Sequence, residues 1–308
     1  MTASPLNDIR TLIAGLPGPD EQARAAAASA LAEPGALGRL DEIALWLAAW
    51  RGEARPEIRR PIVALFAGAP GPGRLEMAEA MRARLEAIAA GGATVSRMAA
   101  QVGAGLEAFD LAIDRPIGAI AEVPALGERE AAATMAFGME VLAKQPDLLL
   151  AGEVAGGDQA PAAALALALF GGETYGWIDH DFDRVTEAVG RARREDPADG
   201  LDWLRQLGGR EIAAVAGAIL AARNQKTPVI LDGYGACAAA AVLQATVPGS
   251  IDHCLIAAAP AGSGHARLVL ALGRPPLLDL GFQGAEGTGA IAALSMVKLA
   301  GAVLSPGA

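Results

Sequence analysis

Cysteine and histidine are scarce in this sequence. Its 308 residues include two cysteines, Cys237 and Cys254, and three histidines, His180, His253 and His265. Their spacing does not match the paired ligands of a structural zinc site, so no metal is expected, and nothing in the sequence points to a cofactor. Both cysteines lie in apolar surroundings, which predicts buried free thiols and fits a reducing compartment.

Long apolar runs and basic clusters are also missing. The longest apolar stretches, 162–170 and 212–222, are shorter than the roughly 20 residues of a membrane-spanning helix. The N-terminus lacks the basic and apolar regions of a signal peptide, so we expect a cytoplasmic protein with no membrane partner. A net charge of −10 without a basic run argues against nucleic acid. A small molecule is the expected ligand.

Alanine dominates what is present. Hydrophobic residues make up 53% of the chain, but aromatic residues only 4%. This combination predicts many helices packed closely together. The length suffices for one large α/β domain with a smaller helical one. We expect the small domain to combine residues 1–60 with 290–308, and the main α/β domain to span 61–289.

Short apolar runs alternate with helical patterns along the chain. This alternation predicts a Rossmann-like parallel sheet of about six strands, covered by helices on both faces. The expected strands are 62–67, 106–113, 148–152, 228–231, 254–258 and 277–280. The expected helices are 21–31, 37–50, 75–90, 93–101, 131–144, one from about 161, one ending at 194, 200–207, 211–223, 236–244, 265–272, and one from 290.

Several expected strands end in glycine and a carboxylic acid. Glu153 follows Gly152, Asp232 precedes Gly233, and Glu286 lies in the glycine-rich turn before the last helix. Ligands of parallel sheets bind outside the carboxyl ends of the strands, where these three side chains would converge. Glu286 either accepts hydrogen bonds from helix-start amides or faces a cleft and takes a proton from a ligand. The residues alone leave both roles open.

Seven motifs occur in the order seen in nicotinate-nucleotide:dimethylbenzimidazole phosphoribosyltransferases, and the chain resembles that family over roughly residues 20 to 300. The motifs are Gly35-Ala-Leu-Gly-Arg-Leu-Asp-Glu-Ile-Ala44, Phe66-Ala-Gly68, Gly91-Gly-Ala93, Gly152-Glu153, Leu231-Asp-Gly233, Gly264-His265 and Glu286-Gly-Thr-Gly-Ala290. The resemblance implies a homodimer that transfers phosphoribose from nicotinate mononucleotide to dimethylbenzimidazole. The product, α-ribazole phosphate, becomes the lower-ligand nucleotide loop of cobalamin.

The resemblance also implies site residues. Glu286 matches the catalytic glutamate, which removes the imidazole proton of dimethylbenzimidazole, and Glu153 matches a second active-site glutamate. The remaining expected substrate-binding residues are Gly152, Gly156, Gly157, Asp232, Gly233, Gly287, Thr288, Gly289 and His265. The glycines would let backbone amides approach a phosphate. His265 follows Gly264 near a helix start, so a capping or packing role is the alternative to ligand binding.

The chain departs from the family pattern at polar positions. The lysine of Lys-Pro-Pro-Gly is absent from 32–38, and the Asp-His-Gly after the first strand is Ala69-Pro-Gly71. The Asn-Thr-Thr of the loop after Glu153 reads Asp158-Gln-Ala160, a Gly-Arg-Gly-Thr-Gly segment after Trp177 is deleted, and the lysine that follows it is replaced near Thr186. Ala258, Pro260 and Gln283 replace His, Ser and Arg. Most of the lost groups would hold a phosphate.

Two functions follow from this mixture. The first is a phosphoribosyltransferase with Glu286 as general base and an altered or compensated phosphate pocket. The second is a catalytically degenerate paralogue, acting either as the partner subunit of an active relative in a heterodimer or as a sensor of a benzimidazole-like base. Retention of the base loop favours the first, and the loss of phosphate-binding groups favours the second.

Overall fold

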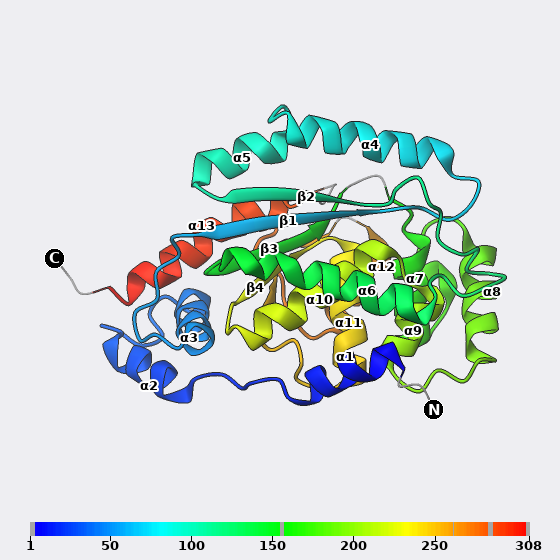
Figure 1. The fold of residues 1–308 in the computed structure, drawn as a ribbon. Coiled ribbons are helices and arrows are strands. Elements are labelled where there is room, and N and C mark those ends of the chain that lie inside the picture. The colour runs from blue at the N-terminus through cyan, green and yellow to red at the C-terminus, as the bar shows by residue number, and fades with distance from the viewer. Residues whose placement is uncertain (1–3, 155–156, 261, 283–285, 306–308) are drawn as a thin grey trace.

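The computed structural model describes residues 4–154, 157–260, 262–282 and 286–305. Its centre is a parallel sheet with the strand order β2-β1-β3-β4-β5 (Figure 1). The strands are β1 (Pro61–Gly68), β2 (Gly105–Leu111), β3 (Leu148–Glu153), β4 (Val229–Asp232) and β5 (Cys254–Ile256). The parallel α/β architecture expected from the sequence is confirmed.

Strand β1 shows how the sheet separates two hydrophobic cores. Its eight residues are all buried, and successive side chains point to opposite faces. Ile62, Ala64 and Phe66 belong to one core, with α6 (Glu128–Met139), α7 (Ala160–Phe170), α10 (Arg210–Asn224) and α11 (Tyr234–Thr246). Val63, Leu65 and Ala67 belong to the other, with α3 (Arg39–Arg51), α4 (Leu75–Ala89), α5 (Thr94–Val102) and α13 (Thr288–Val303). Both faces of the sheet are therefore covered, as expected.

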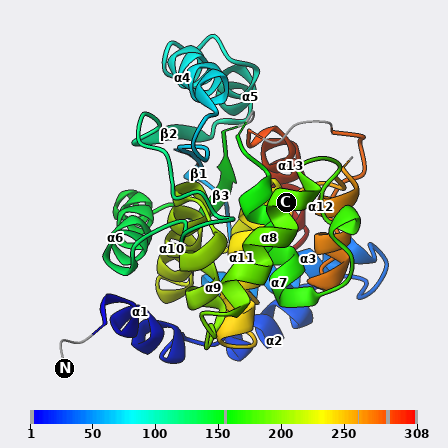
Figure 2. The same cartoon turned by 90° about the vertical axis from the view of Figure 1, so that its right-hand side faces the viewer.

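The remaining helices extend these two layers. Helices α1 (Pro5–Ala14), α8 (Phe182–Arg193), α9 (Gly200–Leu207) and α12 (Ser263–Ala271) contribute to the first core, and α2 (Glu21–Ala30) to the second. Two short 3₁₀ helices, η1 (Glu140–Lys144) and η2 (Thr174–Gly176), complete the set. Figure 2 shows α7, α8 and α9 together on one side of the molecule. In the described part of the chain, no helix is both long and apolar enough to cross a membrane.

The sixth expected strand, 277–280, does not form within the described residues, where the sheet has five strands. Leu278 makes only an isolated parallel bridge with Ala258. The backbone N–H groups of Leu277 and Leu278 donate to Ile256 and Ala257, and the N–H of Ala259 donates to Leu278. The segment thus lies beside β5, but Pro275 and Pro276 precede it and cannot donate ladder hydrogen bonds. The apolar run is in place but too short to become a strand.

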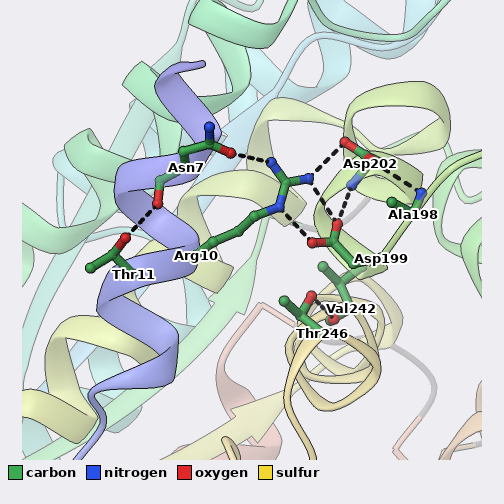
Figure 3. Close-up of polar contacts among 8 residues, drawn as sticks. All are labelled: Asn7, Arg10, Thr11, Ala198, Asp199, Asp202, Val242 and Thr246. Carbon is green, nitrogen blue, oxygen red and sulfur yellow. Dashed lines mark hydrogen bonds and ion pairs between the residues drawn. The ribbon is translucent and has the colours of Figure 1, made fainter. Parts of the chain in front are cut away.

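An arginine joins the N-terminal helix to the main body. Arg10 of α1 pairs with both carboxylate oxygens of Asp199, at 2.6 Å and 3.1 Å, and with Asp202 at 2.9 Å (Figure 3). Asp199 also caps α9 by accepting from the N–H of Asp202. At the other end of the chain, α13 packs against α3. The assignment of both chain ends to one small domain remains a prediction.

Candidate active site

A cavity of about 500 Å³ opens at the carboxyl ends of the strands. Its walls come from the ends of β1, β3 and β4, the loops that follow them, and the starts of α7, α10, α11 and α12. This is the place where ligands of open parallel sheets bind. The described lining contains five acidic side chains, Glu153, Asp158, Asp179, Glu211 and Asp232, and no lysine or arginine.

Glu153 ends β3 and is held by the first turn of α11. Its Oε1 accepts the backbone N–H of Gly235 at 2.9 Å, and its Oε2 accepts that of Ala236 at 3.0 Å. Gly233 has φ +112°, and a Cβ there would lie 2.5 Å from Glu153 Oε1, so only glycine fits. Burial raises the pKa of Glu153 to about 7 despite these hydrogen bonds. The carboxyl therefore titrates near neutral pH.

Asp232 ends β4 and is held in the same way by α13. Its Oδ2 accepts the backbone N–H groups of Gly289 at 3.0 Å and Ala290 at 3.2 Å. Burial raises the pKa of Asp232 to about 6. Both acids at strand ends thus line the cavity and also accept hydrogen bonds from helix-start amides. That either acid takes a proton from a ligand stays a prediction.

Glu286 lies just before α13, with φ +65°. Its Oε1 accepts a hydrogen bond from Arg84 Nη1 of α4 at 2.7 Å, and its side chain is 19% exposed. It is absent from the described lining of the cavity, although Phe282, four residues earlier, is part of it. Glu286 is therefore not part of the described cavity wall. It lies just before the first turn of α13, whose amides donate to the cavity residue Asp232.

The other expected site residues divide similarly. Gly157, Gly233 and His265 line the cavity. Gly152 is buried in β3, where a Cβ would lie 2.8 Å from the carbonyl oxygen of Asp232. Residues Gly287, Thr288 and Gly289 form the start of α13 and are not part of the described lining. Gly156 lies outside the described residues, as does Gln283.

His265 is half-buried and packs against the buried residues Tyr234 and Cys237. Its Nε2 lies 3.3 Å from Cys237 Sγ, and its ring stacks on Tyr234 with centroids 5.5 Å apart. Burial lowers the pKa of His265 to about 4, so the imidazole is neutral at pH 7. The expected packing role is therefore realised together with contact to the cavity.

Cys237 and Cys254 are both buried and free, which confirms the prediction of buried free thiols.

Glu211 is a cavity residue that the sequence analysis missed. It lies in the first turn of α10, beside Gly68 at the end of β1. Its Oε2 is buried and has no hydrogen-bond partner among the described residues. Burial raises its pKa to about 8, and the neighbouring charge of Glu153 adds to the shift. Acidic residues are common in the first turn of a helix, where they interact favourably with the helix dipole. The local sequence around Glu211 therefore did not indicate that its carboxyl lines a cavity.

Several of the positions at which the chain departs from the family pattern lie in the described cavity wall, whereas 32–38 and Thr186 do not. Ala69, Pro70, Ala258 and Pro260 line it with apolar or small side chains. Asp158 lines it with a carboxylate that two arginines contact. The wall is thus acidic at the strand ends and apolar beyond β1 and β5.

Comparisons with known proteins agree over almost the whole chain. A model of a family described as phosphoribosyltransferase matches residues 17–307. A nicotinate-nucleotide–dimethylbenzimidazole phosphoribosyltransferase of Rhizobium rhizogenes is 47% identical over 98% of this chain and 94% of its own length. The protein of the same name from Sinorhizobium medicae is 48% identical over 98% and 95%. The crystal structure of CobT from Thermus thermophilus superimposes with a TM-score of 0.83 at 28% identity, covering 92% of this chain and 96% of that one.

Proposed function

The chain belongs to the nicotinate-nucleotide–dimethylbenzimidazole phosphoribosyltransferase family, and we propose that its strand-end cavity carries out that family's transfer. The enzyme moves phosphoribose from nicotinate mononucleotide to 5,6-dimethylbenzimidazole, giving α-ribazole 5'-phosphate and nicotinate. This reaction builds the nucleotide of the cobalamin lower ligand. The observation that carries the proposal is the acidic cavity at the strand ends, in a chain 47% identical to a relative of that name over 98% of its length.

The reaction needs a base and exact placement of two rings. One imidazole nitrogen of dimethylbenzimidazole attacks the anomeric carbon of the ribose, and the bond from that carbon to the pyridinium nitrogen breaks. The bonding electrons return to the pyridine ring, so nicotinate leaves without needing an acid. The proton on the second imidazole nitrogen must go to a base. A single carboxylate and correct positioning therefore suffice.

Glu286 is the residue we assign as that base. The match of Glu286-Gly-Thr-Gly-Ala290 to the family's catalytic loop supports the assignment. The hydrogen bond from Arg84 fixes the direction of the carboxylate beside α13. Because Glu286 is not in the described cavity wall, the base acts from the start of α13, the helix whose first amides donate to Asp232.

Glu153 and Asp232 are assigned to the donor. Positive charge is present on the pyridinium ring before transfer and spreads to the ribose ring as the bond breaks. Carboxylates that helix-start amides already hold in place stabilise such charge without reorganising. Their positions at the ends of the adjacent strands β3 and β4 place both beside the same part of the cavity.

A direct assay tests the transfer. Purified protein is mixed with nicotinate mononucleotide and dimethylbenzimidazole, and α-ribazole phosphate is measured by chromatography. Glu286→Gln should lower kcat by at least ~100-fold, the lower end of the usual general-base effect. Glu57→Gln, which removes a carboxylate from an exposed ion pair with Arg59, is the control and should leave kcat unchanged.

The outcomes separate the assignments. Product formation that survives Glu286→Gln would place the base elsewhere, with Glu153→Gln as the next variant. Binding of dimethylbenzimidazole without any product would instead indicate the catalytically degenerate partner or sensor. The names of the relatives do not favour that alternative.

We further propose that the enzyme works in the cytoplasm as a homodimer. The buried free thiols of Cys237 and Cys254 are compatible with a reducing compartment. Large apolar side chains on the surface, including Leu270 and Leu280, are available for a subunit contact. Sedimentation of the purified chain distinguishes a homodimer from a monomer that pairs only with a paralogue.

A further inference from the structure

Asp158 occupies a site built for an anion. Arg184 binds its carboxylate through two parallel contacts, Nη1 to Oδ1 at 3.0 Å and Nη2 to Oδ2 at 2.6 Å. The backbone N–H of Ala160 donates to Oδ1 at 3.1 Å, and that of Gly71 to Oδ2 at 3.4 Å. Arg74 Nε lies 3.7 Å from Oδ2. Two guanidinium groups and two amides therefore converge on one carboxylate, whose side chain is only 5% exposed.

The donors come from three separate segments around the cavity. Gly71 and Arg74 belong to the loop after β1, Ala160 begins α7, and Arg184 belongs to α8. A Cβ at Gly71 would lie 2.6 Å from Arg184 Nη2, so the guanidinium packs directly on the loop backbone. Asp158 itself lines the cavity. The anion site thus borders the cavity, because Asp158 is part of the described lining and the two arginines that contact it are not.

A phosphorylated substrate needs cations that the cavity wall does not supply. A phosphate monoester carries nearly two negative charges at neutral pH, and burying it unpaired is strongly unfavourable. The described wall holds five acidic side chains and no lysine or arginine. Arg74 and Arg184 directly contact one of those acids.

We propose that Arg74 and Arg184 bind the 5'-phosphate of the donor nucleotide, and that Asp158 occupies their site until the phosphate displaces it. This inference rests on the proposed function, because that function supplies the phosphorylated donor. A guanidinium presents the same pair of N–H groups to a carboxylate and to a phosphate. The phosphate replaces one negative charge with nearly two, so it outcompetes the chain's own carboxylate for both arginines.

The charges around the site fit this exchange. Arg74 also pairs with Asp181, and Arg184 lies 3.5 Å from the same residue. Without a ligand, the two arginines are balanced by Asp158 and Asp181. When Asp158 leaves, Asp181 still orients both guanidinium groups while one positive charge becomes available to the phosphate. Burial raises the pKa of Asp158, but Arg184, Arg74 and the Ala160 amide together outweigh that effect, and the pKa lies below its ordinary value. Asp158 is therefore a charged competitor at neutral pH.

Two substitutions with opposite expected effects test the inference. Affinities for nicotinate mononucleotide and for nicotinate riboside, which lacks the phosphate, are measured by calorimetry. Asp158→Asn removes the competing charge but keeps the shape, so nucleotide binding should become about 10-fold tighter. Arg184→Gln should weaken it by about 10- to 100-fold, the range expected for a lost charge-assisted hydrogen bond. Riboside affinity should not change in either variant.

A structural ion pair would behave differently. If the Asp158–Arg184 pair only holds α8 to the loops, both substitutions would weaken both ligands together, and the inference would be overturned. The matched control is Asp199→Asn, which breaks a similar arginine bridge between α1 and α9 (Figure 3). Asp199 is not part of the described cavity lining. It should lower the melting temperature without changing the ratio of nucleotide to riboside affinity. Arg184→Lys, which keeps the charge but not the paired N–H groups, should fall between wild type and Arg184→Gln.

Inorganic phosphate separates this inference from the proposed function. Phosphate should raise the melting temperature of wild type and, at lower concentrations, of Asp158→Asn, but not of Arg184→Gln. If this pattern is seen but no α-ribazole phosphate forms, the proposed anion site is supported and the proposed transferase function is rejected. Transfer activity with equal phosphate effects in all three proteins would retain the transferase and reject Arg74 and Arg184 as its phosphate site.

Discussion

Glu153 at the end of β3 accepts a 2.9 Å hydrogen bond from the backbone N–H of Gly235 in the first turn of α11. This bond joins an acidic side chain in the cavity to the positive end of a helix. Burial nevertheless raises the pKa of Glu153 to about 7, because the carboxylate has lost its water. Its charge at neutral pH therefore depends on small changes of pH, unlike that of an ordinary glutamate.

The first prediction concerns the pH dependence of transfer. The role proposed for Glu153, stabilising positive charge on the donor, requires the ionised carboxylate, so kcat/KM should fall as pH drops through about 7. The fall should be up to tenfold per pH unit below the pKa. Rates are measured between about pH 5.5 and 9 at constant ionic strength, a range that brackets this pKa. Glu153→Gln should be slower and should lack this limb; a limb that persists unchanged in the variant would assign the titration to another group.

The second prediction concerns stability and Glu211. Burial raises its folded pKa from 4.5 to about 8, so the folded state binds the proton more tightly than the unfolded chain. Above pH 8 the unpaired charge lowers the free energy of unfolding, and this penalty disappears as pH falls to the ordinary value near 4.5. Glu211→Gln should therefore stabilise the protein by on the order of 4 kcal/mol at pH 8, and much less at pH 5.

Urea unfolding at both pH values measures the effect of Glu211→Gln. Glu76→Gln, which changes an exposed acidic residue in the first turn of α4, is the control and should remain within about 0.5 kcal/mol of wild type at either pH. A Glu211→Gln variant that is less stable than wild type at pH 8 would mean that the carboxylate has a stabilising partner in solution.

The local sequence predicted most of the fold because strands and helices here have strong signals. The run Leu148-Leu-Leu-Ala-Gly-Glu153 is too short for an ordinary helix and ends in glycine and an acid, and it forms β3. Pro161 marks the first turn of α7 as expected. The prediction of a strand at 277–280 was wrong. An apolar run does not show how many of its backbone groups pair with a neighbouring strand, and here only one isolated bridge forms, between Leu278 and Ala258.

The candidate site was predictable only in part. Glu153 and Asp232 were found because the ends of parallel strands meet at one edge of the sheet. Glu211 and the Arg184–Asp158 pair were not found, because their contacts depend on how loops from different strands fold together. Arg184 and Asp158 are 26 residues apart, and nothing in their local sequence links them. The resemblance to the family predicted which phosphate-binding groups are absent, whereas the structure shows that Arg74 and Arg184 converge on Asp158 beside the cavity.

The last prediction concerns the helix contact behind the sheet. Helices α6 and α10 approach so closely that a Cβ at Gly138 would lie 1.9 Å from the carbonyl oxygen of Ala214, and one at Gly217 would lie 1.9 Å from that of Met135. Each glycine thus faces the backbone of the opposite helix, which cannot move aside as a side chain can. Gly217→Ala should lower the free energy of unfolding by about 1–3 kcal/mol, the usual cost of overpacking.

Gly190→Ala in α8 is the matched control for this helix contact. A Cβ at Gly190 meets nothing within 4 Å, so alanine there should stabilise the protein by about 0.5–1 kcal/mol through its better helix propensity. Chemical unfolding measures the free energy of unfolding of both variants. If close backbone contact decides the outcome, this free energy falls in Gly217→Ala and rises in Gly190→Ala. Equal stabilisation by the two substitutions would show that α6 and α10 lie further apart in solution. Because α10 also carries Glu211 at its start, Gly217→Ala should shift the cavity wall and weaken donor binding, whereas Gly190→Ala should not.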